Sequence, residues 1–132
     1  TLDGRGFAVL FCDLDGFKAV NDRFGHRVGD EVLRIVTRRL SESLREHDLI
    51  ARLGGDEFAV LLDSSPDYAE HVAFMLSRIL DEAVTVDGLL IPIGISVGRA
   101  AFPQDGRTMD ELLHAADLRM YEMKQQRKTA AS

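Results

Sequence analysis

The sequence predicts an α+β domain with a ferredoxin-like βαββαβ core, in which an antiparallel central sheet is flanked by helices. Residues 6–12 form a nearly continuous apolar run, which is typical of a central strand covered on both faces. Two apolar segments surround a Gly-Gly pair, the pattern of a β-hairpin, at Ile50, Leu53 and residues 58–62. Helical patterns alternate with these strands. We expect helices on one face of the sheet and the other face open for chemistry.

The composition is that of one globular domain. A chain of 132 residues is long enough to bury a core, and 45% apolar residues with only three prolines exclude a disordered or fibrous design. The formal net charge of −6 argues against binding to long nucleic acid, because a phosphate backbone requires a basic surface. A phosphate ligand must therefore be held by a metal ion or by a few specific cations.

The cysteine count and the hydropathy pattern limit the kinds of bonded site and the cellular location that the chain can have. Cys12 is the only cysteine, so an internal disulfide and a thiolate zinc cluster are both excluded, and we expect Cys12 in the core. The chain has no apolar run near 18 residues and no signal peptide. We therefore expect a cytoplasmic domain without direct membrane contact, although a parent protein with a membrane anchor stays possible.

The first strand ends at a carboxylate, Asp13. A strand terminus is a common place for a metal ligand, because the backbone fixes the side chain while ligands can still reach it. The Asp-x-Asp-Gly pattern here is not a calcium-binding EF-hand loop, since Phe17 and Lys18 stand where that loop needs an oxygen ligand and a glycine.

A short helix and a turn over residues 17–28 lead to a longer helix that we expect to be capped around Gly29-Asp30. Its apolar residues recur every four positions, at Val32, Val36, Leu40 and Leu44. Asn21 and Asp30 have the acceptor and donor groups that the edge of a guanine base requires. Alternatively, Asp30 is simply an N-cap and Asn21 a helix-end residue.

The hairpin tip holds Gly54, Gly55, Asp56 and Glu57. The glycines tolerate positive φ and lack side chains, which allows a tight turn and close approach of a bulky anion. Two carboxylates beside an open backbone suit a divalent cation and a phosphate, although an ordinary hairpin with a solvated acidic strand start also fits. Because the first strand and the hairpin are neighbours in such a sheet, Asp13 is expected near this pair. Three converging carboxylates repel each other unless a cation lies among them, and we predict Mg²⁺ or Mn²⁺.

The remaining segments complete the core. Residues 63–66 form a turn and cap before a helix, and residues 84–92 form a small hairpin. Residues 93–100 alternate apolar and small side chains, so this strand is expected to be pressed closely against a neighbour. Thr108 is expected to cap a last helix whose buried stripe is Leu112, Ala116, Met120 and Met123. Between the second helix and the hairpin, Arg45 and Asp48 are spaced for a local ion pair.

Six motifs, in order and spacing, resemble the GGDEF diguanylate cyclase domain from about residue 5 to residue 124. They are Asp13-x-Asp15-x-Phe17-Lys18-x-x-Asn21-Asp22, Gly25-His26-x-x-Gly29-Asp30, Arg45-x-x-Asp48, Gly54-Gly55-Asp56-Glu57-Phe58, Ser96-x-Gly98 and Ala116-Asp117-x-x-Met120-Tyr121-x-x-Lys124. Six motifs in register over more than a hundred residues make a specific signal, whereas each alone is weak.

The resemblance implies an enzyme that condenses two GTP into cyclic di-GMP and two pyrophosphates, on a palm-like fold shared with nucleotide cyclases and polymerases. Each domain is expected to hold one GTP, so a homodimer is needed for catalysis. By similarity, Asp13, the backbone carbonyl of Leu14 and Asp56 hold the metal, and Asp56 or Glu57 helps to deprotonate the attacking 3′-hydroxyl. Metal-assisted phosphoryl transfer requires such groups.

The resemblance also implies the binding residues. Asn21 and Asp30 match guanine-binding positions, with His26 in the same pocket; Lys18 and Lys124 match phosphate-contacting lysines, and Gly54 and Gly55 border the substrate. Arg45 and Asp48 match the inhibitory site for the product cyclic di-GMP. A further arginine usually completes that site, and Arg78 is a candidate that spacing alone does not place.

Residues 1–132 are expected to form a single GGDEF domain that lacks the usual N-terminal Leu-Thr-Gly-Leu helix segment and any regulatory domain. The family's terminal Gly-Arg-Asn is replaced near Arg127-Lys128-Thr129, which leaves the second phosphate cation open. The alternative function is a non-catalytic module that senses GTP or cyclic di-GMP and regulates an attached domain. A dimerisation unit without a ligand is the third option. Intact Asp13, Asp56 and Glu57 favour catalysis.

Overall fold

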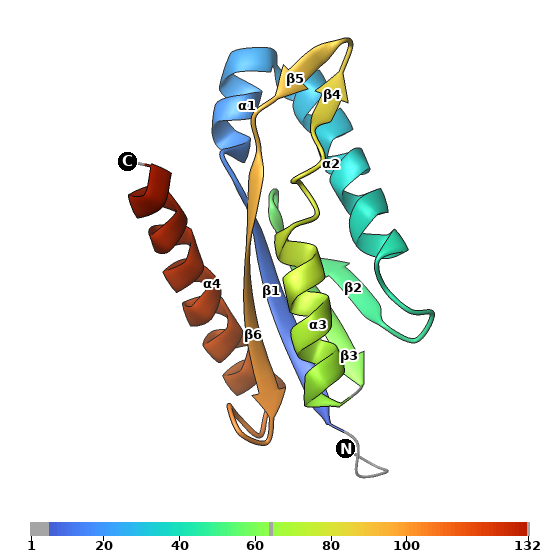
Figure 1. Ribbon diagram of the computed structural model, residues 1–132, viewed down its shortest axis with the longest axis vertical. Coiled ribbons are helices and arrows are strands. Elements are labelled where there is room, and N and C mark those ends of the chain that lie inside the picture. The colour runs from blue at the N-terminus through green and yellow to red at the C-terminus, as the bar shows by residue number, and fades with distance from the viewer. Residues whose placement is uncertain (1–5, 64, 132) are drawn as a thin grey trace.

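The computed structural model describes residues 6–63 and 65–131, with side chains described up to residue 127. The elements follow in the order β1 (Phe7–Asp15), α1 (Phe17–Phe24), α2 (His26–Glu42), β2 (Leu49–Arg52), β3 (Glu57–Asp63), α3 (Pro66–Ser77), β4 (Val84–Val86), β5 (Leu89–Ile91), β6 (Gly94–Phe102) and α4 (Met109–Ala131) (Figure 1).

The central sheet has the strand order β2-β3-β1-β6, and each neighbouring pair is antiparallel. This is the order of a ferredoxin-like βαββαβ core, so the predicted fold class is confirmed. β1 lies between β3 and β6, which makes the first strand a direct neighbour of the central hairpin, as predicted. The small hairpin predicted over residues 84–92 is also present as β4 and β5, which pair with each other outside the central sheet.

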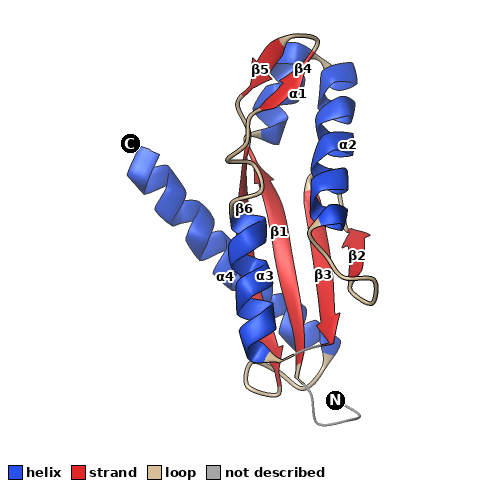
Figure 2. Cartoon of the chain, turned by 45° about the vertical axis from the view of Figure 1, so that its right-hand side comes forward, coloured by secondary structure: helices blue, strands red, loops and turns tan. Residues whose placement is uncertain are grey.

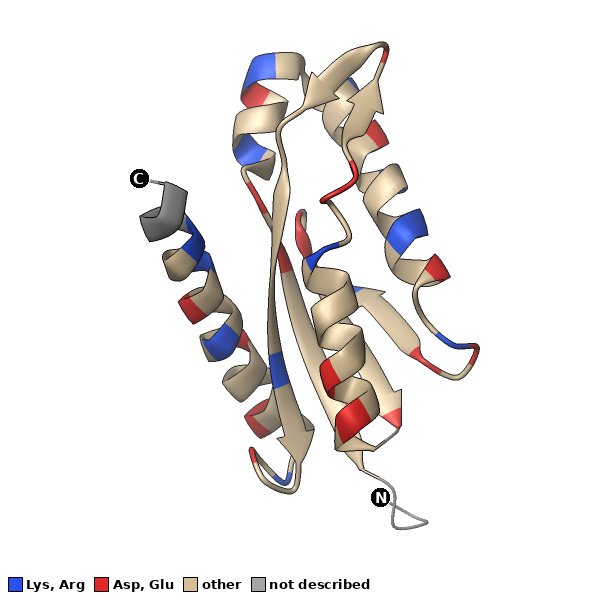
Figure 3. Cartoon of the chain, in the orientation of Figure 1, with Lys and Arg blue, Asp and Glu red and all other residues tan. Residues whose placement is uncertain are grey.

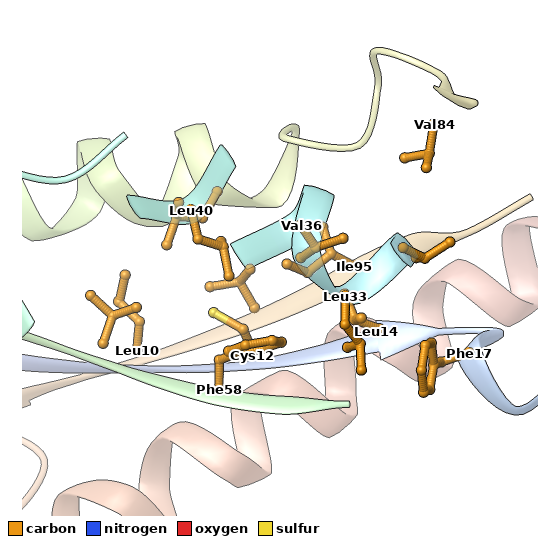
Figure 4. Close-up of a cluster of buried hydrophobic side chains, with 14 of the residues drawn as sticks. Leu10, Cys12, Leu14, Phe17, Leu33, Val36, Leu40, Phe58, Val84 and Ile95 are labelled. Atoms are coloured by element: carbon orange, nitrogen blue, oxygen red, sulfur yellow. The ribbon is translucent and has the colours of Figure 1, made fainter. Parts of the chain in front are cut away.

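The helices cover both faces of the sheet, so the expectation of one open face is wrong. Alternate residues of β1 enter two different apolar clusters. Leu10, Cys12 and Leu14 pack with residues of α1 and α2 in the larger cluster (Figure 4). Residues of α3 belong to the same cluster. Val9 and Phe11 point the other way and pack against α4, which lies on the opposite side of the sheet (Figure 2). The unbroken apolar run of β1 reflects this burial on both sides.

The close contact predicted for the strand over residues 93–100 is made with α4. A Cβ atom added at Gly98 of β6 would lie 2.0 Å from the carbonyl oxygen of Ala116 and 2.2 Å from the backbone nitrogen of Met120. Only glycine allows the two backbones to approach this closely. The predicted stripe of α4 is confirmed at Leu112, Ala116 and Met120, which are buried, whereas Met123 is partly buried.

Three local predictions need correction. The longer helix begins at His26, one turn before the predicted cap at Gly29-Asp30, and Leu44 lies beyond its end at Glu42. Gly29 lies inside the helix, and its missing Cβ leaves room for Asn21, whose Oδ1 would lie 1.8 Å from a Cβ placed there. At the hairpin tip, neither Gly54 nor Gly55 has a positive φ, unlike the described glycines Gly16, Gly25 and Gly88.

Caps and core otherwise follow the sequence. Ser65 and Thr108 accept hydrogen bonds from the backbone nitrogens of Tyr68 and Glu111, respectively, and so cap α3 and α4. Cys12 is fully buried, and burial raises the pKa of its thiol to about 12, which leaves it unreactive. No helix in the described ranges is both long enough and apolar enough to cross a membrane.

Candidate functional site

The end of β1 and the tip of the central hairpin lie side by side. Asp13 pairs with Glu57 at the last position of the β1–β3 register. One residue further, the backbone nitrogen of Leu14 donates a 3.0 Å hydrogen bond to the carbonyl oxygen of Asp56. The antiparallel register therefore brings together the acidic residues that the sequence placed in two separate segments.

These carboxylates interact electrostatically. The pKa of Asp56 is raised, first by burial and then by the negative charge of Asp13. The pKa of Glu57 is raised by burial and by the charges of Asp13, Asp56 and Asp117. A group of acids that raise each other's pKa in this way is a favourable place for a positive charge.

Lys124 of α4 supplies one positive charge. Its Nζ lies 2.5 Å from Asp13 Oδ2 and 3.6 Å from Asp15 Oδ1. Figure 3 shows acidic residues along β1 and at the hairpin tip, with basic residues in the C-terminal part of α4. The other carboxylate oxygen of Asp13, Oδ1, is buried and has no hydrogen-bond partner.

The donors at this site suit a hard divalent cation. Within the part of the chain that the structure describes, no three His, Cys, Asp or Glu side chains are grouped to hold a metal ion. Mg²⁺, however, is commonly held by one or two carboxylates together with substrate phosphates. Asp13 with its unpartnered oxygen, Asp56 and the adjacent backbone of Leu14 fit that kind of incomplete site.

Asp15 and Ser96 belong to this site, although their motifs gave them no role in the sequence. The Oγ of Ser96 lies 3.0 Å and 2.8 Å from the two carboxylate oxygens of Asp15, to which it donates. Ser96 is fully buried, and it stands opposite Asp13 in the β1–β6 register. In the sequence, the one indication of this role was a single hydroxyl residue within an otherwise apolar and small-residue strand.

A second group of predicted residues surrounds the start of α2. Asn21 packs against Gly29, the residue that precedes Asp30 in the chain. Asp30 lines a pocket of about 560 Å³ together with Leu33, Arg34, Thr37, Arg38 and Arg52. Lys18 and His26 are exposed, on α1 and at the first residue of α2. Asn21 therefore lies beside the backbone neighbour of Asp30, and the shared guanine site of these two residues stays a prediction.

Arg52 fixes the glycine turn, a role that the sequence did not indicate. Its Nε donates to the carbonyl oxygen of Gly54 at 2.9 Å, and its guanidinium Nη2 donates to that of Gly55 at 3.0 Å. A Cβ at Gly55 would meet nothing within 4 Å, so the backbone there is open to a ligand. At Gly55 the absence of a side chain leaves the backbone accessible, and the φ angle is not unusual.

Arg45 and Asp48 form the predicted ion pair, with 3.6 Å between guanidinium nitrogen and Asp48 Oδ1. Asp48 is almost fully buried, and the hydroxyl of Tyr68 donates to its Oδ2 at 2.8 Å. Burial and this contact with Asp48 raise the pKa of Tyr68, so the phenol stays protonated. Arg78 pairs instead with Asp81 and stacks on Phe74. Across the described residues, no hydrogen bond or ion pair joins Arg78 to Arg45 or Asp48.

Comparison with known proteins identifies the fold. The family model described as diguanylate cyclase, GGDEF domain, matches residues 2–130. The chain belongs to the GGDEF domain family. The resemblance found in the motifs is therefore confirmed.

Relatives of this GGDEF domain are longer proteins. The chain is 45% identical over 125 residues to the bifunctional diguanylate cyclase/cyclic di-GMP phosphodiesterase MucR of Pseudomonas aeruginosa, covering 94% of the chain and 18% of MucR. It is 41% identical over 124 residues to the cyclic di-GMP phosphodiesterase NbdA of the same species, covering 93% of the chain and 16% of NbdA. The chain thus spans less than a fifth of either relative.

A third relative has a solved GGDEF domain. The diguanylate cyclase TpbB of Pseudomonas aeruginosa is 43% identical over 122 residues, which cover 90% of this chain and 28% of TpbB. The crystal structure of its GGDEF domain superposes with a TM-score of 0.86 and covers 95% of this chain and 80% of that structure. The predicted palm-like α+β architecture is confirmed by this likeness.

Proposed function

We propose that this GGDEF domain is a diguanylate cyclase that condenses two GTP into cyclic di-GMP and two pyrophosphates. The observation that supports it best is the convergence of Asp13 and Asp56 at one end of the sheet, with a buried Asp13 oxygen that has no hydrogen-bond partner. Membership of the GGDEF family and the similarity to TpbB and MucR also support this activity.

In this proposal Asp13, Asp56 and the backbone carbonyl of Leu14 hold a divalent cation, Mg²⁺ or Mn²⁺. When bound, the cation neutralises charge on the triphosphate and lowers the pKa of the attacking 3′-hydroxyl. Asp56 or Glu57 accepts the proton of that hydroxyl. The raised pKa of both carboxyls suits a proton acceptor better than that of an ordinary, fully solvated acid does.

The remaining residues bind and orient GTP. Asp30 accepts from the adjacent N–H groups of guanine, Asn21 meets the same base, and His26 belongs to the same nucleotide-binding site. Lys18 and Lys124 contact the phosphates, for which Lys124 must leave Asp13. The open backbone at Gly55, next to Gly54, lets the phosphates approach the turn.

Two copies of the domain must meet, because each holds one GTP and both 3′-hydroxyls attack the α-phosphate of the other nucleotide. We therefore propose that residues 1–132 act as one domain and that a homodimer is the active form. Arg45 and Asp48 form the inhibitory site for cyclic di-GMP, where an arginine and a carboxylate match the acceptors and donors of guanine.

A purified sample incubated with GTP and Mg²⁺ tests the proposal when pyrophosphate and cyclic dinucleotide are followed together. Two pyrophosphates should appear per cyclic di-GMP, and ATP should give neither. Asp56→Ala is expected to abolish the product and to weaken metal-dependent GTP binding. Product formation by this variant at the parent rate would disprove the mechanism.

The second candidate is a non-catalytic module that binds GTP or cyclic di-GMP and regulates an attached domain. The relative NbdA, named a cyclic di-GMP phosphodiesterase, favours it. The same incubation separates the two candidates, since a sensing module binds the nucleotide and releases no pyrophosphate.

A further inference from the structure

Asp48 is a buried carboxylate with only one of its two oxygens satisfied. Its side chain is 1% exposed. Oδ2 accepts a 2.8 Å hydrogen bond from the backbone nitrogen of Arg45 and another of 2.8 Å from the hydroxyl of Tyr68. Oδ1 is buried without a hydrogen-bond partner, and the nearest arginine nitrogen lies 3.6 Å away. A buried acceptor left in this state is costly and needs an explanation.

Arg45 and Tyr68 together cover this carboxylate. The guanidinium carbon of Arg45 lies 3.6 Å from the centroid of the Tyr68 ring. The Tyr68 ring packs on the edge of the main core, while the Arg45 side chain is 46% exposed. One cover residue therefore comes from the first turn of α3 and the other from the loop that follows α2. Arg45 is held by stacking and one long ion pair, an arrangement that a ligand can displace.

We propose that Tyr68 is a gate for the product site: its hydroxyl occupies the Asp48 oxygen that a guanine N–H group needs, so cyclic di-GMP binds Asp48 only after this hydrogen bond opens. Guanine presents two adjacent N–H donors, which together match both carboxylate oxygens. The unpartnered Oδ1 is then satisfied by one donor, and Oδ2 exchanges Tyr68 for the other. This inference rests on the proposed function, which assigns Arg45 and Asp48 to the product.

The gate sets the concentration at which the product acts. Apparent affinity equals the affinity of the open site multiplied by the fraction of molecules that are open. Removing the Tyr68 hydroxyl while keeping its ring deletes the contact that stabilises the closed form and leaves the surface under Arg45 in place. Tyr68→Phe should therefore bind cyclic di-GMP about five- to tenfold more tightly than the parent.

Calorimetric titration of the nucleotide-free protein with cyclic di-GMP measures this directly, without metal, GTP or turnover. The matched control is Tyr121→Phe, which removes the hydroxyl of the chain's other tyrosine, an exposed residue of α4. Tighter binding by Tyr68→Phe alone supports the gate. Equal or weaker binding by Tyr68→Phe overturns it, because Tyr68 then only supports the fold or the ligand.

A second measurement on the unmodified chain covers the case in which Tyr68→Phe does not fold. With ¹³C-labelled tyrosine, the chain gives ring signals from only two residues, Tyr68 and Tyr121. Saturation with cyclic di-GMP should shift the Tyr68 ring signals and leave those of Tyr121 in place. Unshifted Tyr68 signals in the saturated protein contradict the gate.

The outcomes also separate this inference from the proposed function. A parent that makes cyclic di-GMP from GTP but never binds it at Arg45 and Asp48 overturns the gate and leaves synthesis standing. If the parent makes no product and the Tyr68→Phe variant binds cyclic di-GMP more tightly than the parent, synthesis is disproved and the gate is supported.

Discussion

The ammonium group of Lys124 lies 2.5 Å from Asp13 Oδ2, so an ion pair joins the last helix to the end of the first strand. These residues stand 111 positions apart and are both largely buried. The pair brings a positive charge to the carboxylates for which we propose a metal ion. If the proposal is right, binding of metal and GTP breaks this contact and turns Lys124 toward the phosphates.

Lys124→Met should increase the response to Mg²⁺ while weakening GTP binding. Without the competing ammonium group, Asp13 and Asp15 are left unneutralised, so Mg²⁺ in the absence of nucleotide should raise the melting temperature of the variant more than that of the parent. GTP affinity should fall about tenfold, because one charged contact to phosphate is lost. Thermal unfolding against MgCl₂ measures the first effect, with the exposed Gln126→Met as control. An equal Mg²⁺ response in variant and parent would contradict the exchange.

Asp56→Asn should stabilise the domain while removing its activity. The folded-state pKa of Asp56 is raised, so its charged form is less favourable in the folded protein than in the unfolded chain. This penalty is absent below the unfolded pKa of about 3.9 and grows as pH rises through the folded pKa. The melting temperature should therefore rise by roughly 3 °C at neutral pH and not at all near pH 3. Calorimetry in metal-free buffer measures the two melting temperatures. A stability gain of Asp56→Asn that persists at pH 3 would show that the charge of Asp56 does not destabilise the fold.

The sequence predicted the strand order and the acidic cluster because both follow from local patterns. A continuous apolar run placed β1 at the centre, and the hairpin pattern around Gly54 fixed the neighbouring strands. The antiparallel register of β1 and β3 then places Glu57 opposite Asp13. The same apolar run indicated burial on both faces of β1, so it argued against the open face that we expected, although it could not show that α4 is the helix on the second face.

The missed side chains depend on packing between distant segments. Ser96 meets Asp15 across 81 positions, and Tyr68 reaches Asp48 across 20. Each is an ordinary polar residue within its own segment, and only the tertiary fold makes it a partner. The same holds for Asn21, which lies against Gly29 of α2, a contact that its own segment did not indicate.

Gly98→Ala should loosen α4 and thereby the position of Lys124. The added methyl group would meet backbone atoms of Ala116 and Met120, which cannot rotate away as a flexible side chain can. We expect the free energy of unfolding to fall by more than about 2 kcal/mol. Gly55→Ala is the control for stability, because its Cβ would meet nothing within 4 Å. Urea unfolding compares the two, and equal midpoints would show that the β6–α4 contact is not tight.

Arg45→Ala should raise the concentration of cyclic di-GMP needed for half inhibition by about tenfold or more, since the proposal places this exposed arginine in the product site and the variant loses its charged contact. The rate of pyrophosphate release from GTP at increasing cyclic di-GMP measures it. Arg107→Ala, at an exposed residue of the loop before α4, serves as the matched arginine control. Unchanged inhibition would remove Arg45 from the product site.

Asp105→Asn should reduce stability at neutral pH and leave it nearly unchanged in acid. Asp105 accepts hydrogen bonds from Arg119 at 2.6 Å and from the backbone nitrogen of Ala101 at 2.8 Å, and the bond from Arg119 lowers its pKa. A depressed folded-state pKa contributes stability above the unfolded pKa of about 3.9, which is lost as pH falls through the folded pKa. The variant should lose about 1 to 2 kcal/mol at pH 7, and this difference should shrink below about pH 3. Urea unfolding at pH 7, 5 and 3 tests it, with the exposed Asp22→Asn as control. A difference from the parent that is the same at all three pH values would show that the charge of Asp105 contributes nothing to the fold.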